Sequence, residues 1–204
     1  ESFIDDLKTA AEFGAGHITI FPLIRSIKEG DEELKEKQER MYEAARKYLK
    51  EVGYNQYSVE DFSKDDEYKI NYQVDAWGVP AKDLILLGTS GFGNLDGYYY
   101  RKEKNTKKYI QKIRERKWPI AELRKLDQKH EHIRRLIFGL HYIDVDRKKY
   151  RERYGVDILK EWRFPLWVMK MGGIIKITPE KISLTESQYF NGSRLWGRVL
   201  FSML

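Results

Sequence analysis

The chain has no cysteine among its 204 residues, and this absence removes several kinds of chemistry at once. Without thiols, the chain cannot form a disulfide, use a thiolate nucleophile, or hold zinc or an iron–sulfur cluster through cysteine. Four histidines are the remaining soft ligands. His130 and His132 stand two residues apart, so on a helix their rings would point to different faces. We therefore predict no metal site within this chain.

Long apolar runs are also absent, and none approaches the roughly 20 residues that a membrane-spanning helix needs. The segment 1–6 lacks the basic stretch that precedes the apolar stretch of a signal peptide. We therefore expect no membrane partner and a cytoplasmic location. Hydrophobic residues make up 41% of the chain and aromatic residues 14%, as is typical of a folded globular protein that buries a core.

Charge is distributed unevenly along the chain. Residues 1–100 carry 12 basic and 20 acidic side chains, a net charge of −8, whereas residues 101–204 carry 26 and 12, a net charge of +14. The stretch 101–135, with 14 basic and 5 acidic side chains, motivates a nucleic-acid-binding winged helix as one alternative. We expect this stretch to be mostly solvated helix surface, and we do not expect nucleic acid to be a partner.

Hydrophobic periodicity predicts that the chain opens with a helix and a short strand. Ser2 and Asp5 are spaced as a capping box at the start of the helix, and a glycine at 14 or 16 ends it. Residues 17–21 read as a buried strand. A long amphipathic helix is predicted over 31–52. Its expected buried stripe is Leu34, Met41, Ala45, Tyr48, Leu49 and Val52.

The middle of the chain combines polar and apolar segments. Residues 54–59 are predicted to form a short strand, and 60–80 to be polar and irregular, with an aromatic cluster of Tyr68, Tyr72 and Trp77. Residues 84–87, Leu-Ile-Leu-Leu, read as a second buried strand.

From residue 105 onward the pattern favours helices followed by a hairpin. Helices are predicted over about 105–117, 127–143 and 146–170, and the hairpin joins 174–177 to 181–184. A final helix is expected from about Thr185. This order predicts a winged-helix-like module.

The segment Gly88-Thr89-Ser90-Gly91-Phe92-Gly93 is the strongest local signal in the sequence. Glycines allow a tight turn and close approach to a ligand, and α/β folds bind ligands at the carboxyl ends of their strands. The pattern is neither the dinucleotide fingerprint, which a helix follows directly, nor the nucleophile elbow of serine hydrolases. A structural turn and a ligand-binding loop both fit it.

The order of several short motifs resembles the oxygen-independent coproporphyrinogen III oxidase family. These motifs are His17-Ile18-Thr19-Ile20-Phe21-Pro22-Leu23, Met41-Tyr42, Gly53-Tyr54-Asn55-Gln56-Tyr57, Tyr72 to Trp77, and Leu87 to Tyr98. Ile133-Arg134-Arg135, Arg151 to Val156 and Leu184-Thr185-Glu186 continue the resemblance, which spans essentially the whole chain. The family also contains heme chaperones, heme-opening enzymes and radical methyltransferases.

The resemblance implies an α/β fold in which residues 17–21 form the last strand of a partial (β/α) barrel. Residues 1–104 would be the terminal part of that barrel with an accessory region, and 105–204 the winged-helix-like domain. Complete members are radical S-adenosylmethionine enzymes that hold a 4Fe-4S cluster through a C-x-x-x-C-x-x-C loop. That loop is absent here, so the chain is expected to be inactive without an N-terminal half, supplied by the same polypeptide or by another chain.

The resemblance also implies four site residues. Ile24 and Phe92 would lie against the adenine of S-adenosylmethionine, with Gly88 and Ser90 shaping the same wall. Ordinary core packing remains the alternative for Ile24 and Phe92. The implied role is to close the cofactor site and contact a tetrapyrrole substrate, and a non-enzymatic heme-binding or chaperone role is the second alternative.

Overall fold

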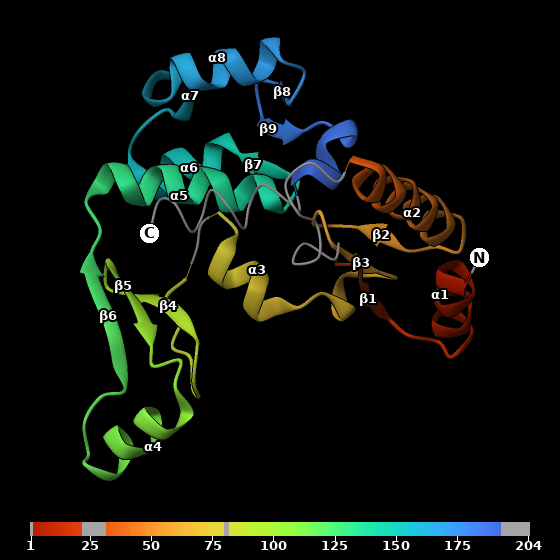
Figure 1. Ribbon diagram of the computed structural model, residues 1–204. Coiled ribbons are helices and arrows are strands. Elements are labelled where there is room, and N and C mark those ends of the chain that lie inside the picture. The colour runs from red at the N-terminus through yellow and green to blue at the C-terminus, as the bar shows by residue number, and fades with distance from the viewer. Residues whose placement is uncertain (1, 22–31, 80–81, 193–204) are drawn as a thin grey trace.

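The computed structural model describes residues 2–21, 32–79 and 82–192. In these ranges the chain folds into helices and three small antiparallel sheets, each of three strands. The strand orders are β1-β3-β2, β4-β5-β6 and β7-β9-β8. Figure 1 shows the first sheet beside α1 and α2, the third sheet with α5 to α8, and the second sheet in an arm that extends away from both.

The first sheet forms between the two N-terminal helices. Its strands are β1 (His17–Thr19), β2 (Asn55–Gln56) and β3 (Asp61–Ser63), with β3 in the centre and antiparallel to both neighbours. All three residues of β3 are buried. The prediction that 60–80 is irregular was therefore wrong at this point, because the polar Asp-Phe-Ser strand does not show the apolar alternation of a half-buried strand.

The helices α1 (Ser2–Glu12) and α2 (Glu32–Glu51) confirm two predicted elements. The buried face of α2 differs in detail from the predicted stripe. Tyr42 is 2% exposed, whereas Met41 and Val52 are 37% and 39% exposed. The hydroxyl of Tyr42 donates to the carbonyl of Val59, so the ring can be buried with its polar end satisfied.

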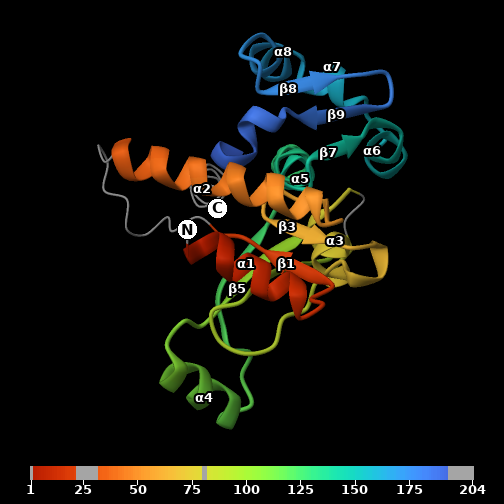
Figure 2. The same ribbon diagram turned by 90° about the vertical axis from the view of Figure 1, so that its right-hand side faces the viewer.

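The second sheet was not predicted as a unit. A 3₁₀ turn, η2 (Asp66–Tyr68), and α3 (Asn71–Trp77) lead to β4 (Phe92–Leu95), β5 (Tyr98–Lys102), α4 (Thr106–Arg114) and β6 (Ile120–Lys125). Figures 1 and 2 both place α4 at the far end of this arm. Because β5 pairs with β6, the predicted domain boundary at 104/105 falls within one sheet, and the division into two domains stays a prediction.

The C-terminal region contains the predicted hairpin and one further strand. Its helices are α5 (Gln128–His141), α6 (Arg147–Tyr154), α7 (Ile158–Glu161) and α8 (Arg163–Met171), and its strands are β7 (Asp144–Asp146), β8 (Ile175–Ile177) and β9 (Lys181–Leu184). The hairpin of β8 and β9 is confirmed, and β7 pairs with the other edge of β9. The described chain after Thr185 begins with a 3₁₀ turn, η3 (Glu186–Gln188).

The single helix expected over 146–170 is broken into three. Gly155 adopts a left-handed conformation with φ of 72° and ends α6, and the Asp157 side chain then caps α7 by accepting from the amide of Leu159. Calling this region winged-helix-like, and β1 a barrel strand, stays a prediction.

The basic stretch 101–135 is also more structured than predicted. It contains the end of β5 and all of β6, and Lys102, Arg134 and Arg135 are 6%, 7% and 4% exposed. Only α4 within it has the predicted character of a solvated helix, with no buried residue.

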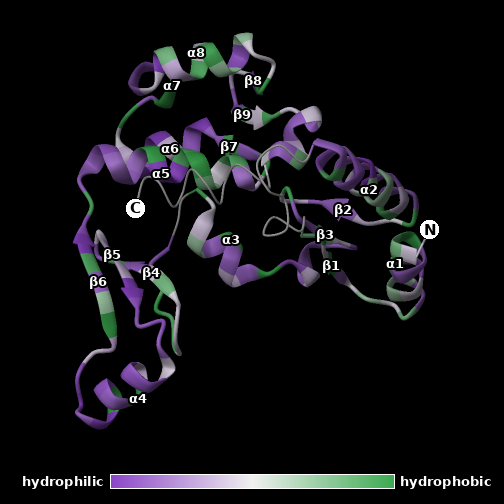
Figure 3. Ribbon diagram, in the orientation of Figure 1, coloured by the Kyte–Doolittle hydropathy of each residue, from purple (hydrophilic) through white to green (hydrophobic). Residues whose placement is uncertain are grey.

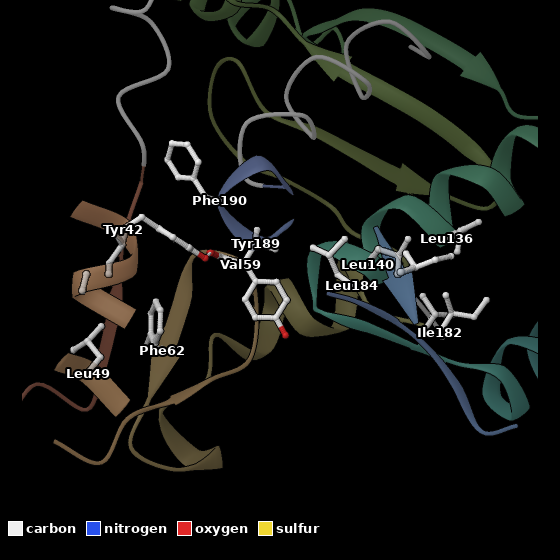
Figure 4. Packing of buried hydrophobic residues seen from close by; sticks show 14 of the residues in the cluster. Tyr42, Leu49, Val59, Phe62, Leu136, Leu140, Ile182, Leu184, Tyr189 and Phe190 are labelled. Atoms are coloured by element: carbon white, nitrogen blue, oxygen red, sulfur yellow. Dashed lines mark hydrogen bonds between the residues drawn. The ribbon is translucent and has the colours of Figure 1, made fainter. Parts of the chain in front are cut away.

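One hydrophobic core connects the first and third sheets. Figure 4 shows Tyr42, Leu49 and Phe62 on one side, with Leu140, Ile182 and Leu184 on the other. Burying each large apolar side chain contributes roughly 1.5–3 kcal/mol. Residues of β4, β5 and β6 do not belong to this core, so the arm has separate packing.

Among the described residues, no helix combines the length and apolarity needed to cross a membrane.

Candidate functional site

The glycine-rich segment lies against the end of β5. The amide of Ser90 donates to the carbonyl of Glu103 at 3.0 Å, and the amide of Lys102 donates to the carbonyl of Gly91 at 2.8 Å. Gly88 has φ of 89° and Ser90 has φ of 64°, whereas Gly91 does not have a positive φ. The tight turn is therefore made at 88–90.

The buried strand predicted before this segment is absent. Leu84 makes a single antiparallel bridge to Asn94, while Ile85 and Leu87 are 63% and 89% exposed. The hydroxyl of Tyr100 holds the segment instead, donating to the carbonyl of Leu84 at 2.9 Å and accepting from the amide of Leu86 at 2.8 Å. An apolar run was mistaken for a strand because periodicity does not reveal whether a partner strand exists.

Phe92, the first residue of β4, belongs to an aromatic wall that we define as Trp77, Phe92, Tyr99 and Phe138. The ring of Trp77 meets the rings of Phe92 and Phe138 edge-on, at centroid distances of 5.1 and 4.4 Å. The centroids of the Phe92 and Tyr99 rings are 6.3 Å apart. The predicted cluster of Trp77 with Tyr68 and Tyr72 was wrong, because Tyr68 and Tyr72 are 45% and 58% exposed and Trp77 packs toward β4 and α5.

Unsatisfied polar atoms border the aromatic wall. Among the described residues, the indole Nε1 of Trp77 and the Nε and Nη2 of Arg134 are buried without hydrogen-bond partners, and Arg134 Nε lies 3.7 Å from Glu131 Oε2. The Arg134 guanidinium stands 5.1 Å from the centre of the Phe138 ring. Burial, followed by the neighbouring Arg135, lowers the pKa of Arg134 to about 10, so the group is still a cation at neutral pH. Within the wall Tyr99 and Phe138 are 1% and 3% exposed, so Trp77 and Phe92 are its two partly exposed rings.

Three of the four predicted site residues thus lie in one described segment. Gly88 and Ser90 make the turn, and Phe92 contributes to the aromatic wall. Ile24 lies outside the described residues. A ligand role for any of the four stays a prediction.

A polar cluster at the first sheet was missed by the sequence analysis. Asp61 accepts from the hydroxyl of Thr19 and from that of Ser58, both at 2.7 Å. The Nε2 of His17 lies 2.9 Å from the hydroxyl of Tyr57 and 3.7 Å from Asp61 Oδ1. In the sequence, the one feature that could have indicated this cluster was the pair of adjacent acids, Glu60 and Asp61. A polar stretch does not indicate that it will form the central strand of a sheet.

Two side chains beside this cluster, Glu60 and His141, have strongly shifted pKa values. Burial, with the charge of Asp61 adding to it, raises the pKa of Glu60 to about 8. Burial lowers the pKa of His141 to about 4 despite the opposing effect of Asp61. Glu60 Oε2 and His141 Nε2 are 3.8 Å apart. At neutral pH both groups are predominantly uncharged, so Glu60 can release a proton and His141 can accept one.

The described residues contain no group of three or more histidine, aspartate or glutamate side chains arranged to hold a metal ion. A cluster held by thiolates would need cysteines that this sequence does not contain.

Comparison with known proteins gives one informative match. No protein-family model and no curated protein matches the chain. Among solved structures, it matches coproporphyrinogen III oxidase from Escherichia coli, which is described as a radical SAM enzyme. The TM-score is 0.67 at 17% sequence identity, and the match covers 99% of this chain. The fold resembles that of this enzyme.

The chain spans 51% of the matched enzyme's length. The resemblance predicted from the order of the short motifs is therefore confirmed as a resemblance of fold, over about half of the larger protein. The match also agrees with the mixed α/β class that the sequence predicted.

Proposed function

We propose that this chain is the C-terminal part of a radical S-adenosylmethionine protein of the coproporphyrinogen III oxidase type. Its role is to close the S-adenosylmethionine site and to contact a tetrapyrrole. The observation that carries this proposal is the match of 99% of the chain to the fold of a radical SAM coproporphyrinogen III oxidase. The remaining half, in the same polypeptide or in a separate chain, supplies the 4Fe-4S cluster and most of the cofactor site.

The aromatic wall and the adjoining turn support this role. Gly88 and Ser90 form a tight turn, and the partly exposed rings of Phe92 and Trp77 are those against which an adenine can stack. Trp77 Nε1 and Arg134 Nη2 are buried donors that have no hydrogen-bond partner among the described residues. S-adenosylmethionine, when bound, supplies the radical chemistry, and these residues would orient it and exclude water.

The decisive experiment combines this chain with the cluster-binding half under anaerobic conditions. We expect this chain alone to assemble no iron–sulfur cluster from iron and sulfide, because it has no thiolate. We expect the cluster-binding half to bind S-adenosylhomocysteine measurably more tightly when this chain is present, as measured by calorimetry. Equal binding with and without this chain would contradict the proposal.

Trp77→Phe separates ligand binding from packing at the aromatic wall. The variant keeps a ring but removes the unpartnered Nε1 donor. We expect weaker binding of S-adenosylhomocysteine to the reconstituted protein with little change in thermal stability. A lower melting temperature with unchanged binding of S-adenosylhomocysteine would show that the aromatic wall contributes to packing and not to ligand binding. Heme binding without cofactor-dependent oxidation of coproporphyrinogen would favour the heme-binding alternative.

A further inference from the structure

The β4–β5–β6 sheet has one face that the main core does not cover. Side chains alternate along a strand, so Tyr98, Tyr100 and Lys102 of β5 point to one face and Tyr99 to the other. Tyr99 is directed to the aromatic wall, 6.3 Å from Phe92. The face opposite the aromatic wall is therefore the one that carries Lys102.

The neighbouring strands add apolar side chains to this face. In the antiparallel register Leu95 of β4 is opposite Tyr98, and Leu123 and Ile120 of β6 are opposite Tyr100 and Lys102. Residues directly opposite each other in such a sheet share a face. Figure 3 shows hydrophobic residues along β6 in the arm.

A cavity of about 360 Å³ lies over this face. Leu95, Tyr98, Tyr100, Lys102, Ile120 and Leu123 line it. Trp118, which is 78% exposed, forms part of its rim. A concave apolar site with a single placed polar group is the usual form of a small-molecule site.

Lys102 is the unusual member of this lining. The residue is only 6% exposed, and its ammonium has no ion-pair partner among the described residues. The acids next to it in the sheet form ion pairs with other side chains. Glu103 Oε1 lies 2.5 Å from Lys112 Nζ, and Glu122 Oε1 lies 2.5 Å from Arg124 Nε. Among the described residues that line the cavity, Lys102 carries the one positive charge and Asp96 the one negative charge, and no described acid forms an ion pair with Lys102. Since a lysine is rarely buried unless its charge is paired, an anionic ligand group is favoured beside it.

The cavity is polar at one end and apolar along its length. The four-residue separation between Tyr98 and Lys102 corresponds to roughly 13 Å along the strand. Asp96 lines the far end of the cavity, at the β4–β5 turn, so the two ends differ in charge. An anionic group is therefore favoured at the Lys102 end.

We propose that this cavity binds an amphiphilic carboxylate, a molecule with an extended apolar body and one carboxylate group. The body lies along Tyr98, Tyr100 and Leu123, and the carboxylate accepts hydrogen bonds from the Lys102 ammonium. This site is separate from the aromatic wall, across the sheet from it, and does not depend on the function proposed above.

The test uses the intact chain and three probes with the same hydrocarbon tail: dodecanoate, dodecanol and dodecyltrimethylammonium, each below its micelle concentration. Calorimetry should show dodecanoate binding roughly 10- to 100-fold more tightly than dodecanol, as expected for a charge-assisted hydrogen bond. The cation should bind least. Equal affinities for the carboxylate and the alcohol would overturn the proposal.

Lys102→Met keeps an unbranched side chain, shorter by one atom, and removes the charge. The variant should bind dodecanoate no better than dodecanol, with its affinity for dodecanol unchanged. Because the Lys102 ammonium has no ion-pair partner among the described residues, its removal should leave the melting temperature unchanged. Retained preference for the carboxylate in a folded variant would overturn the proposal.

Lys125→Met is the matched control. Lys125 is exposed on the same sheet, with its Nζ 5.8 Å from the ring centre of Tyr98, at the end away from Lys102. Its loss should leave the preference for dodecanoate intact, and an equal loss in both variants would contradict the placement of the carboxylate. A concentration-dependent dimer abolished by Leu123→Glu, without dodecanoate binding, would instead assign the face to a second copy of the chain.

Discussion

At the scale of single residues, one buried hydroxyl organises the polar cluster at β3. Ser58 is fully buried, and its Oγ accepts from the amides of Glu60 and Asp61 at 3.1 and 2.9 Å while it donates to the Asp61 carboxylate. Ser63 is equally buried, yet its hydroxyl has no hydrogen-bond partner in the part of the chain that the structure describes. Comparing variants of the two serines therefore separates the contribution of burial to stability from the contribution of hydrogen bonding.

Ser58→Ala should lower the free energy of unfolding by about 1–3 kcal/mol, because buried donors and a carboxylate lose their partner. Ser63→Ala should be neutral or slightly stabilising, since the hydroxyl it removes is unsatisfied. Urea denaturation of both variants measures the difference. Equal destabilisation would show that the Ser58 hydrogen bonds contribute nothing beyond packing.

The buried pair of Glu60 and His141 predicts how stability depends on pH. Glu60 ionises near pH 4.5 when unfolded and near 8 when folded, so its contribution is complete below 4.5 and is lost as pH rises to 8. His141 titrates near 6.5 when unfolded and near 4 when folded, so its contribution is complete above 6.5 and is lost as pH falls to 4. Between 4.5 and 6.5 the two effects oppose each other.

From these two groups we expect a nearly flat stability profile between pH 4.5 and 6.5 and a fall between 6.5 and 8. The slope of the fall is at most about 1.4 kcal/mol per pH unit for one proton. Glu60→Gln should remove this fall and leave stability rising with pH from 4.5 to 6.5. Chemical denaturation at several pH values tests both statements, and an unchanged profile in the variant would exclude Glu60 as the cause.

At the scale of elements, the turn at 88–90 is defined by backbone conformation. A Cβ at Gly88 would meet no atom within 4 Å, so only its φ of 89° demands glycine. Gly93 differs, because its Cβ would come within 2.7 Å of the Tyr100 hydroxyl that fixes the preceding segment. These glycines therefore have distinct roles that the spacing of the motif does not reveal.

Gly88→Ala should lower the free energy of unfolding by about 1–2 kcal/mol, the cost of a left-handed conformation for a residue with a Cβ. Gly172→Ala is the control, since its φ is −75° and its Cβ would make only ordinary contacts of 3.4 Å or more. Thermal and urea denaturation measure both variants. A cost for Gly172→Ala equal to that for Gly88→Ala would contradict this assignment.

At the scale of the whole molecule, the arm and the main core have different packing. The core joins residues from α1 to the segment after η3 and includes both β3 and β9. Residues of β4, β5 and β6 are outside it, and Figures 1 and 2 show the arm extending from the rest of the chain. Elements with fewer buried apolar contacts open at lower free energy.

Amide hydrogen exchange should therefore show the β4–β5–β6 sheet opening below the global free energy of unfolding, while β3 and β9 open only with it. Dodecanoate should slow exchange in the arm selectively if it binds there. Equal protection in β5 and β3 without ligand would show that the arm and the core unfold as one unit.

The sequence alone determined the elements whose signals are local. Helical periodicity located α1 and α2, and two short apolar runs around Thr178-Pro179 located the hairpin of β8 and β9. The order of several short motifs also indicated the family fold, which the match to coproporphyrinogen III oxidase confirms as a fold. These features depend on residues that are close in the chain.

Only the tertiary structure decided which polar and apolar segments gain partners. The apolar run from Leu84 to Leu87 makes one bridge to Asn94 and hydrogen bonds to the Tyr100 hydroxyl but forms no strand, whereas the polar β3 is buried between β1 and β2. In the sequence, Lys102 is one of many basic residues in the stretch 101–135. In the structure, the pairing of β5 with β6 buries it beside a cavity. Pairing between distant segments sets burial, and burial determines both the shifted pKa of Glu60 and the position of Lys102 beside an apolar cavity.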